Sequence, residues 1–336
     1  MKIAVDAMGG DKAPDVVIEG TAEAVELYPF MDIVLVGHLQ KITPLLKQHG
    51  LLNHPRVRLV HAEQAVGMEE PSISSIRGKK HSSITVCAEL VANKEADAVI
   101  SAGHTGAAVA ATTFRMKLLP GVERPGIATV MPSTKGHFVF LDAGANVDCK
   151  PIHLAQYAIM GEIFSKTMGV VKPKIGLLSI GEEDVKGNDL TKEAFKIISK
   201  MPINFIGNIE AKLLYERVAD VVVCDGFVGN IVLKSSESLA KAISVWLKHA
   251  FTKNTLRQAG AILAQNAFKE LKAIADYEEY GGAPLLGVNG ICIIGHGSSS
   301  PKAIKNAIRV AGEMVKCKVT DHIAARLVEC GVAVNK

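Results

Sequence analysis

The chain has 336 residues, of which 48% are hydrophobic and 21% are charged. A chain of this length exceeds the roughly 250–300 residues at which a single core usually stops growing, so we expect one large domain with a lobe, or two domains. The composition excludes extended disorder. The net charge of +4, with five Tyr and one Trp, disfavours a nucleic-acid-binding surface.

The six cysteines and the apolar runs indicate a cytoplasmic protein. None of the cysteines forms a CxxC pair, and several stand in apolar runs, which is typical of reduced, buried thiols. The N-terminus begins with a strand-like segment rather than a secretion signal. No run of about 18 uncharged apolar residues occurs, so we expect no membrane-spanning helix.

Short apolar runs bounded by Gly or Asp recur along the chain and predict strands covered on both faces. In chain order they are Ile3–Val5, Ile33–Val36, Val57–Val60, Ala98–Ile100, Ile127–Met131, Phe138–Leu141, Ile175–Ile180, Ile203–Ile206, Val221–Cys224 and Ile291–Ile294. Helical patterns lie between them, at Val16–Leu27, Ser83–Ala92, Thr105–Met116, Ile152–Met168 and Asp189–Lys200. The alternation predicts an α/β fold of three layers, α/β/α, with a mostly parallel sheet.

Residues 231–276 interrupt the alternation because they contain no convincing strand. We interpret this segment as a helical hairpin, broken near Thr252–Thr255, that projects from a single catalytic domain spanning 1–336. Within it, 241–272 holds six basic residues against one acid, Glu270.

Six glycine-rich segments follow the predicted strands, where ligands bind in open α/β sheets. They are Asp6–Asp11, Ser101–Gly106, Asp142–Asn146, Ser179–Asn188, Asp225–Asn230 and Gly295–Ser299. A single loop of this kind is more often an ordinary turn and helix cap. Six of them on one expected rim, carrying His, Asn, Lys and Asp, indicate a common site.

The chemistry of these loops suits an anion. Glycines bring backbone N–H groups close to a ligand, and a helix N-terminus adds donors and partial positive charge. A phosphate or a phosphorylated group is the expected ligand. The usual nucleotide and hydrolase motifs are missing, since neither GxxxxGK[ST] nor GxSxG occurs, and the only GxG, Gly295–Gly297, lacks its third glycine. No HExxH or compact His/Cys cluster occurs either, so we expect neither a cofactor nor a metal.

The ordered segments DAMGGD, SAGHTGA, LDAGAN, DGFVGN, YGGAPLLG and GHGSS resemble those of the bacterial phosphate acyltransferases of phospholipid synthesis. The resemblance covers nearly the whole chain. It implies transfer of a long-chain acyl group from acyl-acyl carrier protein to orthophosphate, giving acyl phosphate for glycerol 3-phosphate acylation. It also implies a fold similar to isocitrate and isopropylmalate dehydrogenases and phosphotransacetylase, and a cytosolic homodimer at the membrane periphery, near a membrane glycerol-3-phosphate acyltransferase.

Candidate roles follow from this reaction. Lys186 is expected to hold the phosphate, Asn230 or Asn188 to stabilise the oxyanion, and His104 to move any proton. The expected substrate and phosphate contacts are Asp6, Gly9, Gly10, Gly103, Thr105, Gly106, Asn146, Gly229, His296 and Ser298.

Two alternatives stay open for the activity, and two for the hairpin. The acyl donor is either acyl-acyl carrier protein or, as in phosphotransacetylases, acyl-coenzyme A. A non-catalytic membrane-docked scaffold is a further interpretation, but a scaffold has no need of the polar loops. The missing dinucleotide-binding fingerprint argues against a dehydrogenase. The hairpin, with Trp246, Phe251, Leu256 and Leu263, is expected to form a dimer contact, a membrane contact, or both. Acyl-chain preference is not encoded in any recognisable motif.

Overall fold

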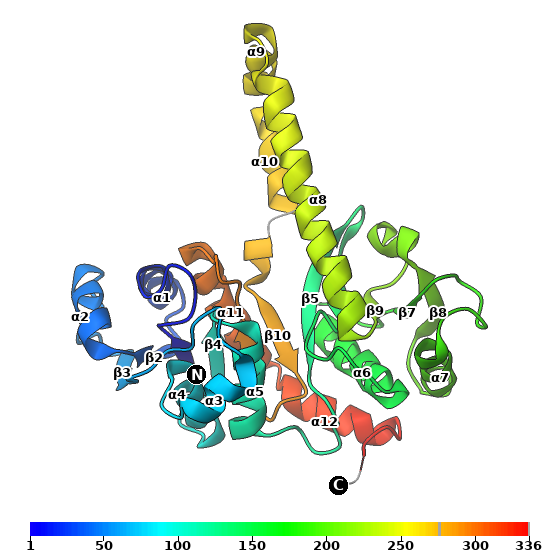
Figure 1. Cartoon of the computed structure of the whole chain (residues 1–336), viewed down its shortest axis with the longest axis horizontal. Coiled ribbons are helices and arrows are strands. Elements are labelled where there is room, and N and C mark those ends of the chain that lie inside the picture. The colour runs from blue at the N-terminus through cyan, green and yellow to red at the C-terminus, as the bar shows by residue number, and fades with distance from the viewer. Residues whose placement is uncertain (275–276, 335–336) are drawn as a thin grey trace.

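The computed structural model describes residues 1–274 and 277–334. Figure 1 shows a broad α/β body from which a long helical hairpin projects. The expected α/β class with a large, mostly parallel sheet is confirmed. One sheet of 11 strands runs through the body, in the order β3-β2-β1-β4-β11-β10-β5-β6-β9-β7-β8.

The sheet consists of two parallel halves joined by antiparallel strands. The first half contains β1 (Lys2–Asp6), β2 (Asp32–Gly37), β3 (Val57–His61), β4 (Ala98–Ser101) and β11 (Ile291–Ile294). The second contains β6 (Gly136–Leu141), β7 (Ile175–Ser179), β8 (Phe205–Glu210) and β9 (Val221–Val223). Between them lie β10 (Ala283–Leu286) and β5 (Gly126–Ser133).

The joining strands reverse the direction of the second half. β10 is antiparallel to β11 and to β5, and β5 is antiparallel to β6. The strands of the second half therefore run opposite to those of the first. The expectation that six loops share one rim was wrong in this respect, because the carboxyl ends of the two halves point in opposite directions along the sheet. The loops instead form two groups of three.

Helices cover both faces of the sheet. They are α1 (Asp15–Leu27), α2 (Leu39–Gln48), α3 (Ser72–Gly78), α4 (Ser83–Ala92), α5 (Thr105–Met116), α6 (Pro151–Thr167), α7 (Asp189–Ile198), α11 (Pro301–Lys316) and α12 (Val319–Glu329), with 3₁₀ turns at Ala211–Glu216 and Tyr277–Tyr280. The bounds predicted for α4 and α5 are confirmed to the residue, whereas α2, α3, α11 and α12 were not predicted.

Three apolar clusters hold the described layers together, and the two larger ones pack the helices of the body against the sheet. The larger packs α1, α2, α6, α11 and α12 against the sheet, and includes the fully buried Tyr157. The second packs α3, α4 and α5 against the other face. It also takes in Ala143 from the second half of the sheet, with Leu233 packed against it. The two halves therefore share a core across their junction.

The hairpin consists of three helices, α8 (Gly226–Thr252), α9 (Thr255–Leu263) and α10 (Gln265–Ile274). The break expected near Thr252–Thr255 is confirmed, but α8 begins at Gly226, inside a candidate loop. The rings of Phe251 and Phe268 pack edge to face at 5.0 Å, so Phe251 contributes to packing within the hairpin. The last two residues of the expected segment, 275–276, lie outside the described residues. None of the helices described in 1–274 and 277–334 is long and apolar enough to cross a membrane.

Candidate active site

The loops after β1, β4 and β11 make direct contact with one another. Asp11 donates its backbone N–H to the Gly297 carbonyl at 2.8 Å, and the Gly295 N–H donates to the Ser101 carbonyl at 2.8 Å. A Cβ on Gly9 would lie 2.8 Å from the Gly103 nitrogen, so only glycine fits where these backbones cross. The Gly10 backbone, at a φ of +117°, lies beside Gly297.

Asp6 lies beneath these loops and organises them. It is 4% exposed and accepts hydrogen bonds from the Ser101 hydroxyl at 2.7 Å and the Met8 N–H at 3.1 Å. Burial raises the pKa of its carboxyl, although these hydrogen bonds act in the opposite direction. Its nearest partners are protein groups, which fits a supporting position below the anion site.

His104 caps the N-terminus of α5 with its ring. Its Nδ1 accepts the Ala107 N–H at 3.2 Å, so in the neutral imidazole the proton resides on Nε2. That Nε2–H is available as a donor beside Thr105, an exposed residue of the first turn of α5, and Gly106. A cavity of about 10 Å³, the size of one water molecule, lies between His104 and Asp6.

The loop after β11 contributes a second histidine to this group. His296 Nδ1 lies 2.8 Å from the Ser298 hydroxyl and accepts the Ser298 backbone N–H at 3.2 Å. The His296 ring is therefore oriented by Ser298 of the same loop. The first group therefore presents two histidine rings and several backbone donors.

The second group is organised by Asp142, whose carboxylate is fully buried. It accepts four backbone N–H groups, from Ile127, Gly144, Ala145 and Asn146, at 2.8–3.0 Å. Burial nevertheless raises the pKa of Asp142. Sequence reasoning missed this scaffold, although an Asp directly after a buried strand and before glycine was visible in LDAGAN.

Asn146 is committed to holding the loop. Its Nδ2 donates to the Pro125 carbonyl and, at 2.8 Å, to the hydroxyl of the buried Tyr157. Because its amide protons are engaged inside the protein, Asn146 positions the loop rather than offering its side-chain N–H groups to a ligand.

The N-terminus of α8 places Asn230 above this loop. Asp225 caps the helix by accepting the N–H groups of Phe227 and Val228 at 3.0 and 2.9 Å. A Cβ on Gly229 would stand 1.8 Å from the Asp142 carbonyl oxygen, so the helix can approach only with glycine there. Asn230 is exposed, and a Cβ on Gly144 would lie 3.3 Å from its Cβ. Its amide is therefore free to face a ligand.

The loop after β7 carries Lys186 and Asn188. Asn188 caps α7, and its Oδ1 accepts the Thr191 N–H at 2.9 Å, which leaves only its Nδ2 as a donor. Lys186 is exposed, and its alkyl chain covers Gly181. No ion pair joins it to another residue in the described part of the chain, so its ammonium group is available to an anion.

The two groups divide the expected chemistry between them. The first offers imidazole and backbone donors at the N-terminus of α5, and the second offers the ammonium of Lys186 and the amide of Asn230. Ala143, Ala145 and Leu233 connect the Asp142–Asn146 loop and α8 to the apolar cluster that also contains residues of α5. Among 1–274 and 277–334, no group of three or more His, Cys, Asp or Glu side chains could hold a metal ion.

Comparison with known proteins gives a consistent picture. Residues 1–322 match the family model described as "Fatty acid synthesis protein". A protein of Geotalea daltonii named "Phosphate acyltransferase" is 46% identical over 330 residues, covering 98% of this chain and 95% of the relative. One of Thermodesulfovibrio yellowstonii with the same name is 51% identical over 332 residues, covering 97% and 94%.

Solved structures with a similar fold include a phosphotransacetylase from Streptococcus pyogenes. It has a TM-score of 0.63 and 19% identity, covering 94% of each chain. A putative 4-hydroxythreonine-4-phosphate dehydrogenase from Salmonella typhimurium has a TM-score of 0.52 and 12% identity, covering 93% of this chain and 99% of that one. At these identities the likeness concerns the fold alone.

Proposed function

Because this chain belongs to the fatty acid synthesis protein family, whose relatives are named phosphate acyltransferase, we propose that it transfers a long-chain acyl group from acyl-acyl carrier protein to orthophosphate. The observation that carries the proposal is near 50% identity to these relatives along almost the whole chain. The product, acyl phosphate, would serve a membrane enzyme that acylates glycerol 3-phosphate.

The reaction forms one bond and breaks one. A phosphate oxygen attacks the thioester carbonyl, the carbonyl oxygen becomes an oxyanion, and the C–S bond then breaks to release the carrier thiol. Catalysis by positioning needs a cation for the phosphate and donors for the oxyanion. Lys186 supplies the cation and the Asn230 amide the donor, with the Asn188 Nδ2 as a second candidate.

His104 suits the transfer of the proton, because its Nε2–H lies on the opposite side of the ring from the Nδ1 that accepts the Ala107 N–H. Its Nε2–H would donate a hydrogen bond to the phosphate, and the proton that hydrogen phosphate loses on becoming acyl phosphate would pass to the leaving thiolate. Thiols leave readily, so the proton contributes less than the contacts of Lys186 and Asn230. His296, Ser298 and the glycine backbones of the first group would hold the remaining phosphate oxygens.

The test traps the product. Wild type incubated with acyl-acyl carrier protein, orthophosphate and hydroxylamine should yield acyl hydroxamate, and acyl-coenzyme A should compete poorly as a donor. Lys186→Ala and Asn230→Ala should lose at least a hundredfold in turnover while Lys192→Ala, an exposed lysine of α7, keeps it. A folded wild type that produces no hydroxamate would refute the reaction, and normal turnover in both variants would refute the assigned roles.

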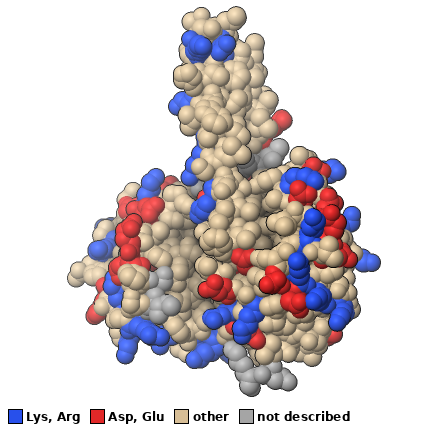
Figure 2. All heavy atoms as spheres, turned by 45° about the vertical axis from the view of Figure 1, so that its right-hand side comes forward, with Lys and Arg blue, Asp and Glu red and all other residues tan. Residues whose placement is uncertain are grey.

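The hairpin supports a second proposal, that its tip contacts a membrane while its stem pairs with another copy. At the tip, Leu256 is 82% and Leu263 88% exposed. Figure 2 shows Lys and Arg spheres at the tip and along one side of the stem, with apolar and neutral surface between them. A basic helical segment with exposed leucines suits the interface of an anionic bilayer.

Liposome flotation distinguishes the two contacts. Leu256→Glu and Leu263→Glu should abolish flotation with anionic vesicles and leave the sedimentation coefficient unchanged. Trp246, which is 64% exposed on the stem, tests the contact with another copy. Trp246→Glu should shift the protein toward a monomer. Unchanged flotation of the tip variants would refute membrane contact at the tip.

A further inference from the structure

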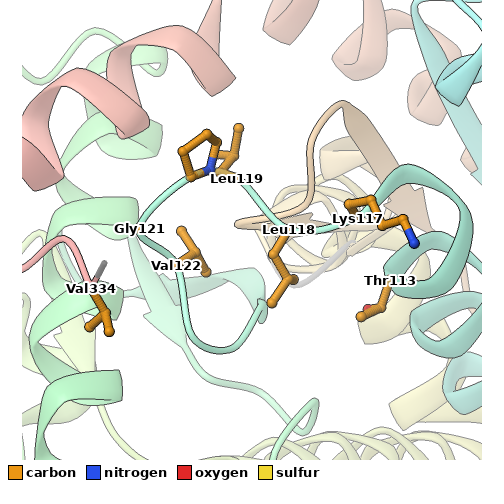
Figure 3. A pocket seen from close by; sticks show the side chains of 8 residues that line it. Thr113, Lys117, Leu118, Leu119, Gly121, Val122 and Val334 are labelled. Carbon is orange, nitrogen blue, oxygen red and sulfur yellow. The ribbon is translucent and has the colours of Figure 1, made fainter. Parts of the chain in front are cut away.

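A groove lies at the carboxyl end of α5, away from the small cavity between His104 and Asp6. Its volume is about 770 Å³, within the range of small-molecule sites. Figure 3 shows Thr113 and Lys117 on one side and Val334 on the other, with the loop 118–122 between them. Since α5 spans 12 residues, the groove is roughly 18 Å along the helix from His104.

The accessible apolar surface of the groove comes from Leu118, Pro120 and Val334. Leu119 and Val122 also border it, but their side chains are buried in the core behind the loop. Val334 donates its N–H to the Gly121 carbonyl at 2.9 Å, which fixes the far wall. A wall of this composition favours a hydrocarbon chain over a sugar or a nucleotide.

Thr113 carries a hydroxyl without a partner. Its Oγ1 is buried and makes no hydrogen bond, whereas the neighbouring Thr112 hydroxyl donates to the Ala108 carbonyl at 2.7 Å. Buried hydroxyls are rarely left unpaired. Threonine in a helix has two accessible χ1 rotamers, and no hydrogen bond holds the Thr113 hydroxyl in its present one.

Lys117 is held in a backbone conformation that lysine rarely adopts. Its φ of 68° and ψ of 176° lie in a region occupied almost only by glycine. The Asn289 N–H donates to its carbonyl at 3.0 Å, and the Leu119 N–H donates to Gly287 at 3.0 Å, so neighbouring contacts impose this geometry. Strain of this kind persists where the structure clamps a ligand.

Lys117 is also the one charged residue among those that line the groove. Its side chain is exposed and forms no ion pair with another residue of the described chain. The carboxyl end of a helix carries a partial negative charge, which repels an anion. The full positive charge of the Lys117 ammonium must therefore outweigh this partial charge for the groove to hold an anion.

We propose that this groove binds a long-chain acyl anion, with its head at Lys117 and Thr113 and its chain along Leu118, Pro120 and Val334. The inference rests on the proposed function, which makes acyl phosphate and handles acyl chains. The same loop continues to Pro125, whose carbonyl accepts the Asn146 amide of the second loop group. The groove and the candidate catalytic loops are thus connected through one short segment.

Equilibrium binding of cis-parinarate, an intrinsically fluorescent long-chain fatty acid, to the full-length protein tests the site. We expect saturable binding that palmitate and hexadecylphosphonate displace, that hexadecanol displaces about tenfold less well, and that orthophosphate leaves unchanged. Tighter displacement by the phosphonate identifies the acyl phosphate as ligand, and tighter displacement by palmitate identifies a free fatty acid.

Variants localise the binding. Lys117→Gln should weaken it about tenfold, Thr113→Val should weaken it less, and Val334→Trp should fill the groove and abolish it. Lys94→Gln is the matched control, because Lys94 is also an exposed lysine at positive φ just after a helix. Thermal unfolding confirms that each variant is folded.

The binding and hydroxamate assays can fail independently, so they test the groove and the proposed reaction separately. Wild-type affinity in both Lys117→Gln and Val334→Trp, or the loss of binding in Asn230→Ala, would overturn the groove. Hydroxamate formation without saturable parinarate binding would refute the groove and leave the reaction intact. Binding without hydroxamate formation would refute the reaction alone.

Discussion

Gly229→Ala should damage both stability and catalysis, because the new methyl group meets backbone. In an open helix this change gains about 1 kcal/mol. Here the added Cβ would stand 1.8 Å from the Asp142 carbonyl oxygen and 3.0 Å from Cys224 Sγ. The Asp142 carbonyl belongs to the backbone and cannot rotate away, so α8 must withdraw from the loop by more than an ångström. Overpacking of this kind costs about 1–3 kcal/mol, which outweighs the helix gain.

The displacement also moves Asn230, the next residue. A misplacement of about 1 Å near a reacting centre costs on the order of a hundredfold in rate. Urea unfolding followed by circular dichroism and the hydroxamate assay measure the two effects. Gly260→Ala is the control, since Gly260 lies in α9 with no heavy atom within 4 Å of the added Cβ. A Gly229→Ala protein as stable and active as wild type would refute the close approach of α8 to Asp142.

Three further predictions concern buried polar groups. At pH 8 iodoacetamide should label exposed Cys317 and spare Cys149 in mass spectra, because burial raises the pKa of Cys149 to about 11. Tyr157→Phe should lower the free energy of unfolding by about 1 kcal/mol in urea, because Asn146 loses its 2.8 Å acceptor; no change would argue against that clamp. Because burial raises the pKa of Asp6, the unfolded state loses its proton first and the contribution of Asp6 to stability falls as the pH rises above 3.8, so urea titrations should favour Asp6→Asn increasingly from that pH upward.

Local patterns predicted most of the individual elements. Continuous apolar runs marked the strands of both parallel halves, and the helices at Ser83–Ala92 and Thr105–Met116 matched their periodicity. Such patterns work because burial on both faces of a strand leaves a direct trace in the sequence.

The direction of the second half was lost because the antiparallel pairing of β5 with β6 was not recognised. Strand β10 was also missed, but its two antiparallel pairings, with β11 and with β5, cancel in direction. Its sequence, APLL, is short and contains Pro284, which argues against a strand. The six residues between the predicted strands Ile127–Met131 and Phe138–Leu141 were, in contrast, too few for a crossover helix and could have revealed an antiparallel hairpin. The missed β5–β6 hairpin therefore placed six correctly identified loops on one rim.

At the candidate site, the sequence predicted which loops take part, but it did not predict the role of each side chain equally well. Asp6 and Asn146 were expected to touch the ligand, but their hydrogen bonds within the protein fit supporting positions. Asp142 was missed because a carboxylate that accepts four backbone N–H groups depends on a tertiary arrangement that no spacing records.

Helix α8 gives the molecule a mechanical connection between two distant places. Its 27 residues contain no proline, and they form about 40 Å of continuous helix. Asn230 lies in the second turn at one end, and the exposed tip lies beyond the other. A load applied at the tip is therefore transmitted as a tilt of the turn that carries Asn230, against a loop that leaves no clearance at Gly229. A displacement of the hairpin tip would therefore reach the candidate active site through α8.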